Sequence, residues 1–248
     1  MSWLWLLFSL ALLVLLERWI HRHLQGLWLL VFRDADVALV IYSLSMLPGV
    51  LLHELSHLLV ATLLGVQAGH FSVIPERMED GTLRLGYVET RKVDFFREAL
   101  IGAAPLILGS AAIIFVSDAW LGVRPVGEAL ARGDLLGMAQ GVQAMTRAAD
   151  FWLWLYFIFT VSNSMLPSAS DRRAWWPVLI VAALVTLFFF YAGLGSVLIA
   201  TLWPAVEAAA RALASAFTLT VGLNLFFAPL IWLAERGVMR VTGLKVEY

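Results

Sequence analysis

The chain contains no cysteine among its 248 residues. A disulfide framework, a thiolate zinc site, an iron–sulfur cluster and a cysteine nucleophile are therefore all excluded. Charge is scarce as well: Asp, Glu, Lys and Arg make up 14% of the chain, its formal net charge is −1, and it has no basic run. This charge balance argues against a nucleic-acid partner.

Apolar side chains are in excess. They make up 61% of the residues, against about 45–50% in ordinary soluble domains, and the mean hydropathy is +0.85. A water-soluble protein of this size cannot bury so much apolar surface. We therefore expect the lipid bilayer to be the solvent of this protein.

Six stretches are apolar and long enough to cross a bilayer, which takes roughly 20 helical residues. They cover residues 3–20, 37–66, 99–121, 151–166, 176–203 and 212–234. The predicted fold class is an all-α polytopic membrane protein with about six transmembrane helices, in which residues 1–248 form a single integral membrane domain. The first stretch has no basic residue before it and no small-residue cleavage site after it, so we expect a retained helix rather than a secretory signal.

Two polar segments separate these stretches. Residues 69–98 alternate loosely between polar and apolar side chains around Asp80-Gly81, which predicts a small β-hairpin between the second and third helices. Residues 124–150 are typical of one or two amphipathic helices lying at the membrane interface. Four apolar residues at helical spacing would form the buried stripe of the second: Leu135, Met138, Val142 and Met145.

The basic residues give an orientation. Six helices place both termini on one side of the membrane, and that side carries ten of the 17 Lys and Arg residues, against seven on the other. Basic loops stay in the cytosol, so the excess favours cytosolic termini. The expected location is the cell (inner) membrane. His21 and His23 follow the first stretch and are expected at the opposite interface.

The second stretch contains the pattern HExxH at His53, Glu54 and His57. Helical positions i and i+4 differ by about 40° around the axis, so the two imidazoles face the same way and could bind one Zn²⁺. Glu54 is rotated about 100° from His53 and could take a proton from a water molecule that the metal activates. Polar groups in a membrane helix are costly, which favours a functional origin for them.

A zinc site needs a third protein ligand, and in this chain it must be Asp, Glu or His at membrane depth on another helix. Asp171, at the end of the fourth stretch, lies on the membrane side that the second stretch approaches. Asp118 is the rival, but it falls near the far end of the third stretch, at a different depth from His57. Asp171 is therefore the preferred third ligand.

An HExxH in a membrane helix, followed about a hundred residues later by Asn163, Pro167 and Asp171, resembles the site-2 protease group of intramembrane zinc metalloproteases. The second motif of that family reads NxxPxxxxDG. Asn163 and Asp171 keep its spacing, Pro167 stands one place later, and Arg172 replaces the glycine. The segment GAAPLILGS at 102–110 resembles the Gly-Pro-Leu element of the family, and the similarity covers about residues 37–175.

The resemblance implies a role for each matching position. His53, His57 and Asp171 would be the zinc ligands, and Glu54 the general base and later acid. Asn163 would orient the substrate backbone or stabilise the oxyanion, a role for which a primary amide is chemically suited. The implied activity is hydrolysis of peptide bonds in a transmembrane protein or peptide substrate, with a further membrane-protein partner as an open alternative.

Three other functions stay open from the sequence. The departures around Asp171 suit a catalytically inactive subunit that structures or regulates a membrane complex. A haem or electron-transfer subunit would use histidines as axial ligands, although such sites usually draw on two facing helices. A transporter would use Glu54 and Asp171 as ion sites, although no repeated half is visible in the sequence.

Overall fold

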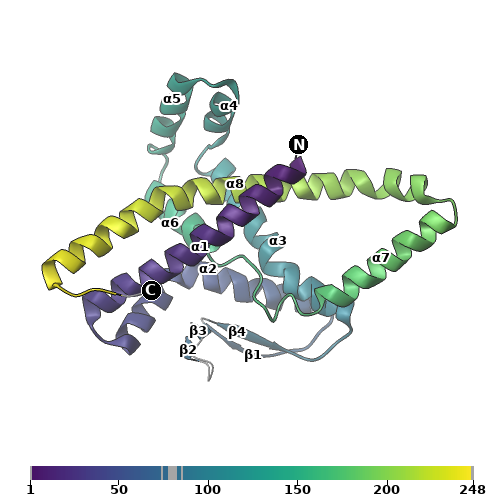
Figure 1. The fold of residues 1–248 in the computed structure, drawn as a ribbon, viewed down its shortest axis with the longest axis horizontal. Coiled ribbons are helices and arrows are strands. Elements are labelled where there is room, and N and C mark those ends of the chain that lie inside the picture. The colour runs from purple at the N-terminus through teal and green to yellow at the C-terminus, as the bar shows by residue number, and fades with distance from the viewer. Residues whose placement is uncertain (1, 74, 78–82, 85, 247–248) are drawn as a thin grey trace.

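The computed structural model describes residues 2–73, 75–77, 83–84 and 86–246. These residues form eight helices and four short strands (Figure 1). The helices are α1 (Ser2–Phe32), α2 (Ala35–Leu63), α3 (Phe95–Ala119), α4 (Arg124–Arg132), α5 (Leu135–Met145), α6 (Phe151–Ser162), α7 (Trp175–Tyr191) and α8 (Gly195–Thr242). The strands are β1 (Ala68–Ser72), β2 (Glu76–Arg77), β3 (Leu83–Arg84) and β4 (Tyr87–Thr90). The prediction of a mainly helical fold with a small hairpin is confirmed.

Local sequence sets several helix ends. Asp34 precedes α2, and its carboxylate accepts hydrogen bonds from the first free backbone N–H groups of that helix. Asp94 does the same for α3. Gly133 and Gly243 end α4 and α8 in the left-handed conformation that glycine adopts without steric cost.

Four helices, α1, α2, α3 and α8, are long and apolar enough to cross a membrane. α1 and α8 run in the same direction side by side (Figure 1). The Trp5 indole donates a hydrogen bond to Thr218 near their first contact, and His23 pairs with Glu235 further along. The helices α6 and α7, of 12 and 17 residues, are apolar but shorter.

The predicted boundary between the last two stretches is wrong. The chain turns at residues 192–194, inside the predicted stretch 176–203, where Gly193 has a φ of +73°. α8 then continues for 48 residues through the rest of that stretch and the whole of 212–234. Glu207 and Arg211 do not break it, because they lie one turn apart and pair at 2.9 Å on its surface. The number of transmembrane helices stays a prediction.

The predicted hairpin is an interrupted antiparallel ribbon. β1 pairs with β4 and β2 pairs with β3, so the two ladders are nested. Its predicted turn at Asp80-Gly81 lies outside the described residues. Strands β1 and β4 contact α2. Figure 1 shows the ribbon on one side of the molecule and the helical hairpin of α4 and α5 projecting from the opposite side.

Small residues let the central helices approach closely. A methyl group added at Gly49 of α2 would overlap the carbonyl of Thr160 in α6. One added at Gly109 of α3 would lie 2.7 Å from the Cβ of Met165, just after α6. The end of α6 is therefore held tightly between α2 and α3, and the segment that follows it carries the candidate ligand Asp171.

Candidate metal centre

The two histidines of the HExxH pattern converge as their spacing predicts. His53 and His57 lie one turn apart on α2, and their Nε2 atoms are 3.2 Å from one another. Both are at most partly exposed, with 14% and 9% of the side chain accessible. They lie in the second half of α2, where the helix passes the end of α6 and the start of α3.

Asp171 brings a carboxylate to the same point. Its oxygens lie 3.7 Å from Nε2 of His53 and 3.4 Å from Nε2 of His57. The backbone N–H and the hydroxyl of Ser168 donate hydrogen bonds of 2.7 and 2.6 Å to it and fix its direction. Burial raises the pKa of Asp171, but the nearby imidazole of His53 and the hydrogen bonds from Ser168 outweigh it, and the pKa falls to about 2. The carboxyl group is therefore ionised at neutral pH.

The other nitrogen of each imidazole determines its tautomer. Nδ1 of His53 meets the carbonyl oxygen of Ser164, and Nδ1 of His57 meets that of Ile101 at 2.9 Å. A carbonyl oxygen can only accept, so each Nδ1 carries the hydrogen and donates it. In the neutral ring Nε2 then holds a lone pair. Two lone pairs and a carboxylate that share one point repel one another unless a cation or a proton lies among them.

The three donor atoms could hold a metal ion. Among the described residues, His53, His57 and Asp171 are the one group of three or more His, Asp or Glu residues whose ligand atoms all lie within 4.8 Å of each other. Hydrogen bonds from the outer imidazole nitrogen to backbone carbonyls are typical of metal-binding histidines, because they orient the ring toward the ion.

Gly102 of α3 explains how Asp171 comes so close to α2. A methyl group at this position would overlap the carbonyl oxygen of Asp171 and lie 2.9 Å from its carbonyl carbon. Only a residue without a side chain therefore allows the Asp171 backbone to pack against α3. Gly102 opens the segment 102–110 noted in the sequence, and this close approach explains why a glycine is needed there.

Glu54 is buried, with 7% of the residue exposed, although it carries a carboxyl group. The hairpin covers it: a methyl group at Gly86, just before β4, would lie 2.9 Å from Cγ and 3.1 Å from Oε1 of Glu54. The side chain thus lies between α2 and the ribbon, one residue along from His53. The hairpin therefore forms part of the surroundings of the candidate centre.

The Asn163 side chain is engaged with α8 and not with the three candidate ligands. Asn163 ends α6 and is 1% exposed, and its amide exchanges hydrogen bonds with the amide of Asn224 in α8, at 2.9 and 3.2 Å. Its amide nitrogen also donates to the carbonyl of Phe159. The structure therefore shows Asn163 in an interhelical pair, and its predicted role toward substrate stays a prediction.

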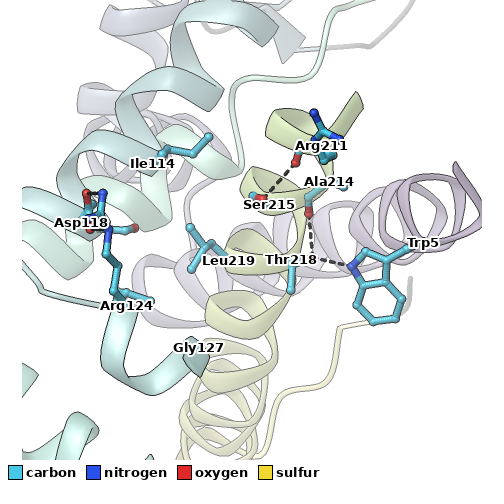
Figure 2. Close-up of a pocket in the computed structure, with 12 residues that line it drawn as sticks. Trp5, Ile114, Asp118, Arg124, Gly127, Arg211, Ala214, Ser215, Thr218 and Leu219 are labelled. Carbon is cyan, nitrogen blue, oxygen red and sulfur yellow. Dashed lines mark hydrogen bonds and ion pairs between the residues drawn. The ribbon is translucent and has the colours of Figure 1, made fainter. Parts of the chain in front are cut away.

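Asp118 does not join the cluster. It lies at the far end of α3 and pairs with Arg124 at 2.6 Å. Both residues line a cavity of about 600 Å³ between α1, α3, α4 and α8 (Figure 2). The cavity is largely apolar, and its two arginines are already paired, Arg124 with Asp118 and Arg211 with Glu207. Of the two aspartates, the structure places Asp171 beside the histidine pair, and its role as a metal ligand stays a prediction.

Several contributors to the centre escape sequence reasoning. The carbonyl groups of Ser164 and Ile101 carry no side-chain signal, because any residue supplies a carbonyl. Ser168 could have been found from its place three residues before Asp171, a spacing at which a serine can bond the carboxylate. No protein-family model, no curated protein and no solved structure matches this chain, so the interpretation of the centre rests on its geometry.

Proposed function

We propose that the protein is an intramembrane zinc metalloprotease that hydrolyses peptide bonds of membrane-protein substrates. The observation that carries this proposal is the convergence of His53, His57 and Asp171 on one point, beside a buried glutamate on the same helix as the histidines. The resemblance to the site-2 protease group stated from the sequence points the same way. The apolar helices support a location in a membrane, with the lipid bilayer around them.

The distances between donor atoms fit zinc. Nitrogen and oxygen ligands about 2.0–2.2 Å from Zn²⁺ at tetrahedral angles lie roughly 3.3–3.6 Å apart. The closest edges of the cluster measure 3.2 Å between the two Nε2 atoms, 3.4 Å from His57 to one oxygen of Asp171 and 3.7 Å from His53 to its other oxygen. Two neutral imidazoles and one carboxylate are a common ligand set of catalytic zinc sites, which leave a fourth position for water or substrate. The same edges argue against axial haem ligation, for which two histidines must lie on opposite sides of an iron.

The residues divide the chemistry as follows. Zinc held by the three ligands supplies Lewis-acid chemistry, polarising a substrate carbonyl and acidifying a water molecule. Glu54 accepts the proton of the attacking water and returns it to the leaving amine nitrogen. Ser164 and Ile101 keep the two imidazoles in the tautomer that offers Nε2.

A membrane-spanning substrate must unwind before it can be cleaved, because its helical amides are bonded internally. The ribbon of β1 and β4 lies beside Glu54 and could hold an unwound segment as an added strand. The substrate class proposed is therefore a transmembrane protein or peptide that becomes extended near the centre.

A second candidate is a catalytically inactive subunit that keeps the metal centre and serves a membrane complex. One observation favours it: the amide of Asn163, the residue expected to assist substrate, is engaged with Asn224 and Phe159. Both candidate functions include zinc binding. Only the protease cleaves peptides, and this cleavage requires Glu54.

The test uses the purified protein reconstituted in proteoliposomes with a pool of synthetic single-span peptides. Elemental analysis measures zinc, and mass spectrometry measures cleavage. We expect one zinc per chain, cleavage by the wild type, and loss of cleavage with retained zinc in Glu54→Gln. Glu128→Gln, on the exposed face of α4, is the matched control and should cleave normally. Wild-type protein without stoichiometric zinc, or unchanged cleavage in Glu54→Gln, would refute the protease assignment, and zinc without cleavage would favour the inactive subunit.

A further inference from the structure

A second polar cluster adjoins the candidate metal centre at residues 163–164, just after α6. His21 of α1 lies between Tyr42 of α2 and the backbone of Asn163 at the end of α6. Tyr42 is 2% exposed, and the amide pair of Asn163 and Asn224 closes the cluster from α8. His21 was expected beyond the first apolar stretch, at the opposite interface. That expectation is wrong, because α1 continues to Phe32 and carries His21 through the bundle.

The acceptors around His21 determine the direction of its hydrogen bonds. Its Nε2 faces the carbonyl oxygen of Asn163 at 2.9 Å, and a carboxylate oxygen of Glu17 lies 3.7 Å from the same nitrogen. Neither group can donate in its usual form, so Nε2 carries the hydrogen. Nδ1 of the neutral ring is then an acceptor, and the Tyr42 hydroxyl donates to it at 2.6 Å. Tyr42 thus holds His21 in the tautomer that donates to Asn163.

Consecutive carbonyl groups connect this cluster to the metal centre. The last carbonyls of a helix have no partner within it and need donors from elsewhere. Beyond the end of α6, the carbonyl of Asn163 accepts from His21, and that of Ser164 accepts from His53. The two carbonyls belong to adjacent residues, so a shift of one moves the other. His21 therefore acts on the same short segment that orients the candidate ligand His53.

We infer that Tyr42 and His21 are positioning residues of the metal centre, acting on His53 through the carbonyl groups of Asn163 and Ser164. The inference rests on the proposed function only in requiring that the centre binds a divalent metal. Neither residue touches the metal or the substrate. Removing a hydrogen bond made directly to a metal ligand typically weakens metal binding about 10–100-fold. His21 and Tyr42 act one step further from the ligand, so a smaller loss is expected.

A purely structural role is the competing explanation, because any buried hydrogen bond between helices stabilises the fold. The chain offers a matched control. Tyr156 of α6 also donates its hydroxyl to α2, at the carbonyl of Ser45 (3.0 Å), but has no contact with His21. Tyr42→Phe and Tyr156→Phe each remove one interhelical hydroxyl, and only the first disturbs the cluster.

The experiment measures the zinc dissociation constant of the folded, detergent-purified full chain by competition with a chromophoric chelator. The visible spectrum of the Co²⁺-loaded protein is the second readout, since it reports ligand geometry and needs no turnover. We expect zinc to bind up to about tenfold more weakly in Tyr42→Phe and in His21→Ala, with the larger loss in His21→Ala and altered cobalt bands in both. His21→Gln keeps an amide donor and should recover part of the loss, and Tyr156→Phe should match the wild type.

Wild-type zinc affinity and cobalt spectra in both Tyr42→Phe and His21→Ala would overturn the inference, as would an equal loss in Tyr156→Phe. Should His21→Ala fail to fold, Tyr42→Phe and His21→Gln decide the matter alone. The outcome is separate from that of the proposed function. A wild type that binds zinc but cleaves no peptide refutes the protease function, and the positioning role of Tyr42 and His21 can still be tested. A wild type that binds no zinc refutes both the protease function and the positioning role.

Discussion

Gly102→Ala tests whether the packing of α3 against the Asp171 backbone determines the metal centre. The added methyl group would overlap the carbonyl oxygen of Asp171 and lie 2.9 Å from its carbonyl carbon, and real Cβ contacts are essentially never shorter than 3.0 Å. The conflict is with backbone, so the Asp171 segment must move. Overpacking typically costs about 1–3 kcal/mol, and alanine returns roughly 0.5–1 kcal/mol of helix preference. The expected net loss of stability is on the order of 1–2 kcal/mol.

The same shift should weaken metal binding more than it weakens the fold. Zinc–ligand distances tolerate changes of only about 0.2 Å, and Asp171 lies 3.4 Å from Nε2 of His57 in the present arrangement. Thermal unfolding in detergent measures stability, and chelator competition measures zinc affinity. Gly222→Ala in α8 is the control, because nothing lies within 4 Å of its added methyl group, and it should be neutral or stabilising. Wild-type zinc affinity and stability in Gly102→Ala would refute the reasoning.

Three further predictions concern the surroundings of the centre. Gly86→Ala should reduce cleavage and leave zinc bound, because its methyl group would lie 2.9 Å from Cγ of Glu54; peptide cleavage and zinc content measure the two effects. Asp118→Asn should leave zinc affinity unchanged and lower stability by less than about 1 kcal/mol, since its ion pair with Arg124 is exposed; a loss of zinc would reopen Asp118 as a ligand. Asn224→Ala should cost about 1–3 kcal/mol in thermal unfolding by leaving the buried amide of Asn163 without its partner, and an additional Asn163→Ala should cost little more if the pair acts as a unit.

The sequence predicted the helical part of the candidate centre because its information is local. Residues four apart on a helix must share a face, so the proximity of His53 and His57 follows from helix geometry alone. The proximity of Asp171 followed from a topological argument, in which the direction of each apolar stretch decides the depth of its ends. The structure brings the three side chains together.

The ends of the helices could not be predicted as well, because polar residues inside a helix resemble its boundary. The predicted first stretch ends at residue 20, just before His21, yet α1 continues to Phe32. Partners in other helices accommodate such polar side chains, as Tyr42 does for His21. The pairing of His21 with Tyr42 depends on the tertiary structure and leaves no periodic signal. The predicted stretches also leave out residues 204–211, yet α8 passes through them, and there Glu207 and Arg211 form a local pair four residues apart.

The helix α7 has a mechanical consequence for the centre. All 17 of its residues are described, and none is buried; in Figure 1 it leaves the bundle and meets α8 only at the outer edge of the molecule. At 1.5 Å per residue it is about 25 Å long, a few ångströms short of a typical hydrocarbon layer. If α7 crosses a bilayer, as the sequence predicts for this stretch, hydrophobic mismatch would act on it more freely than on the packed helices. Its first residue, Trp175, follows Asp171 by four positions, so a change in membrane thickness that tilts this helix would then pull on the segment that carries the carboxylate.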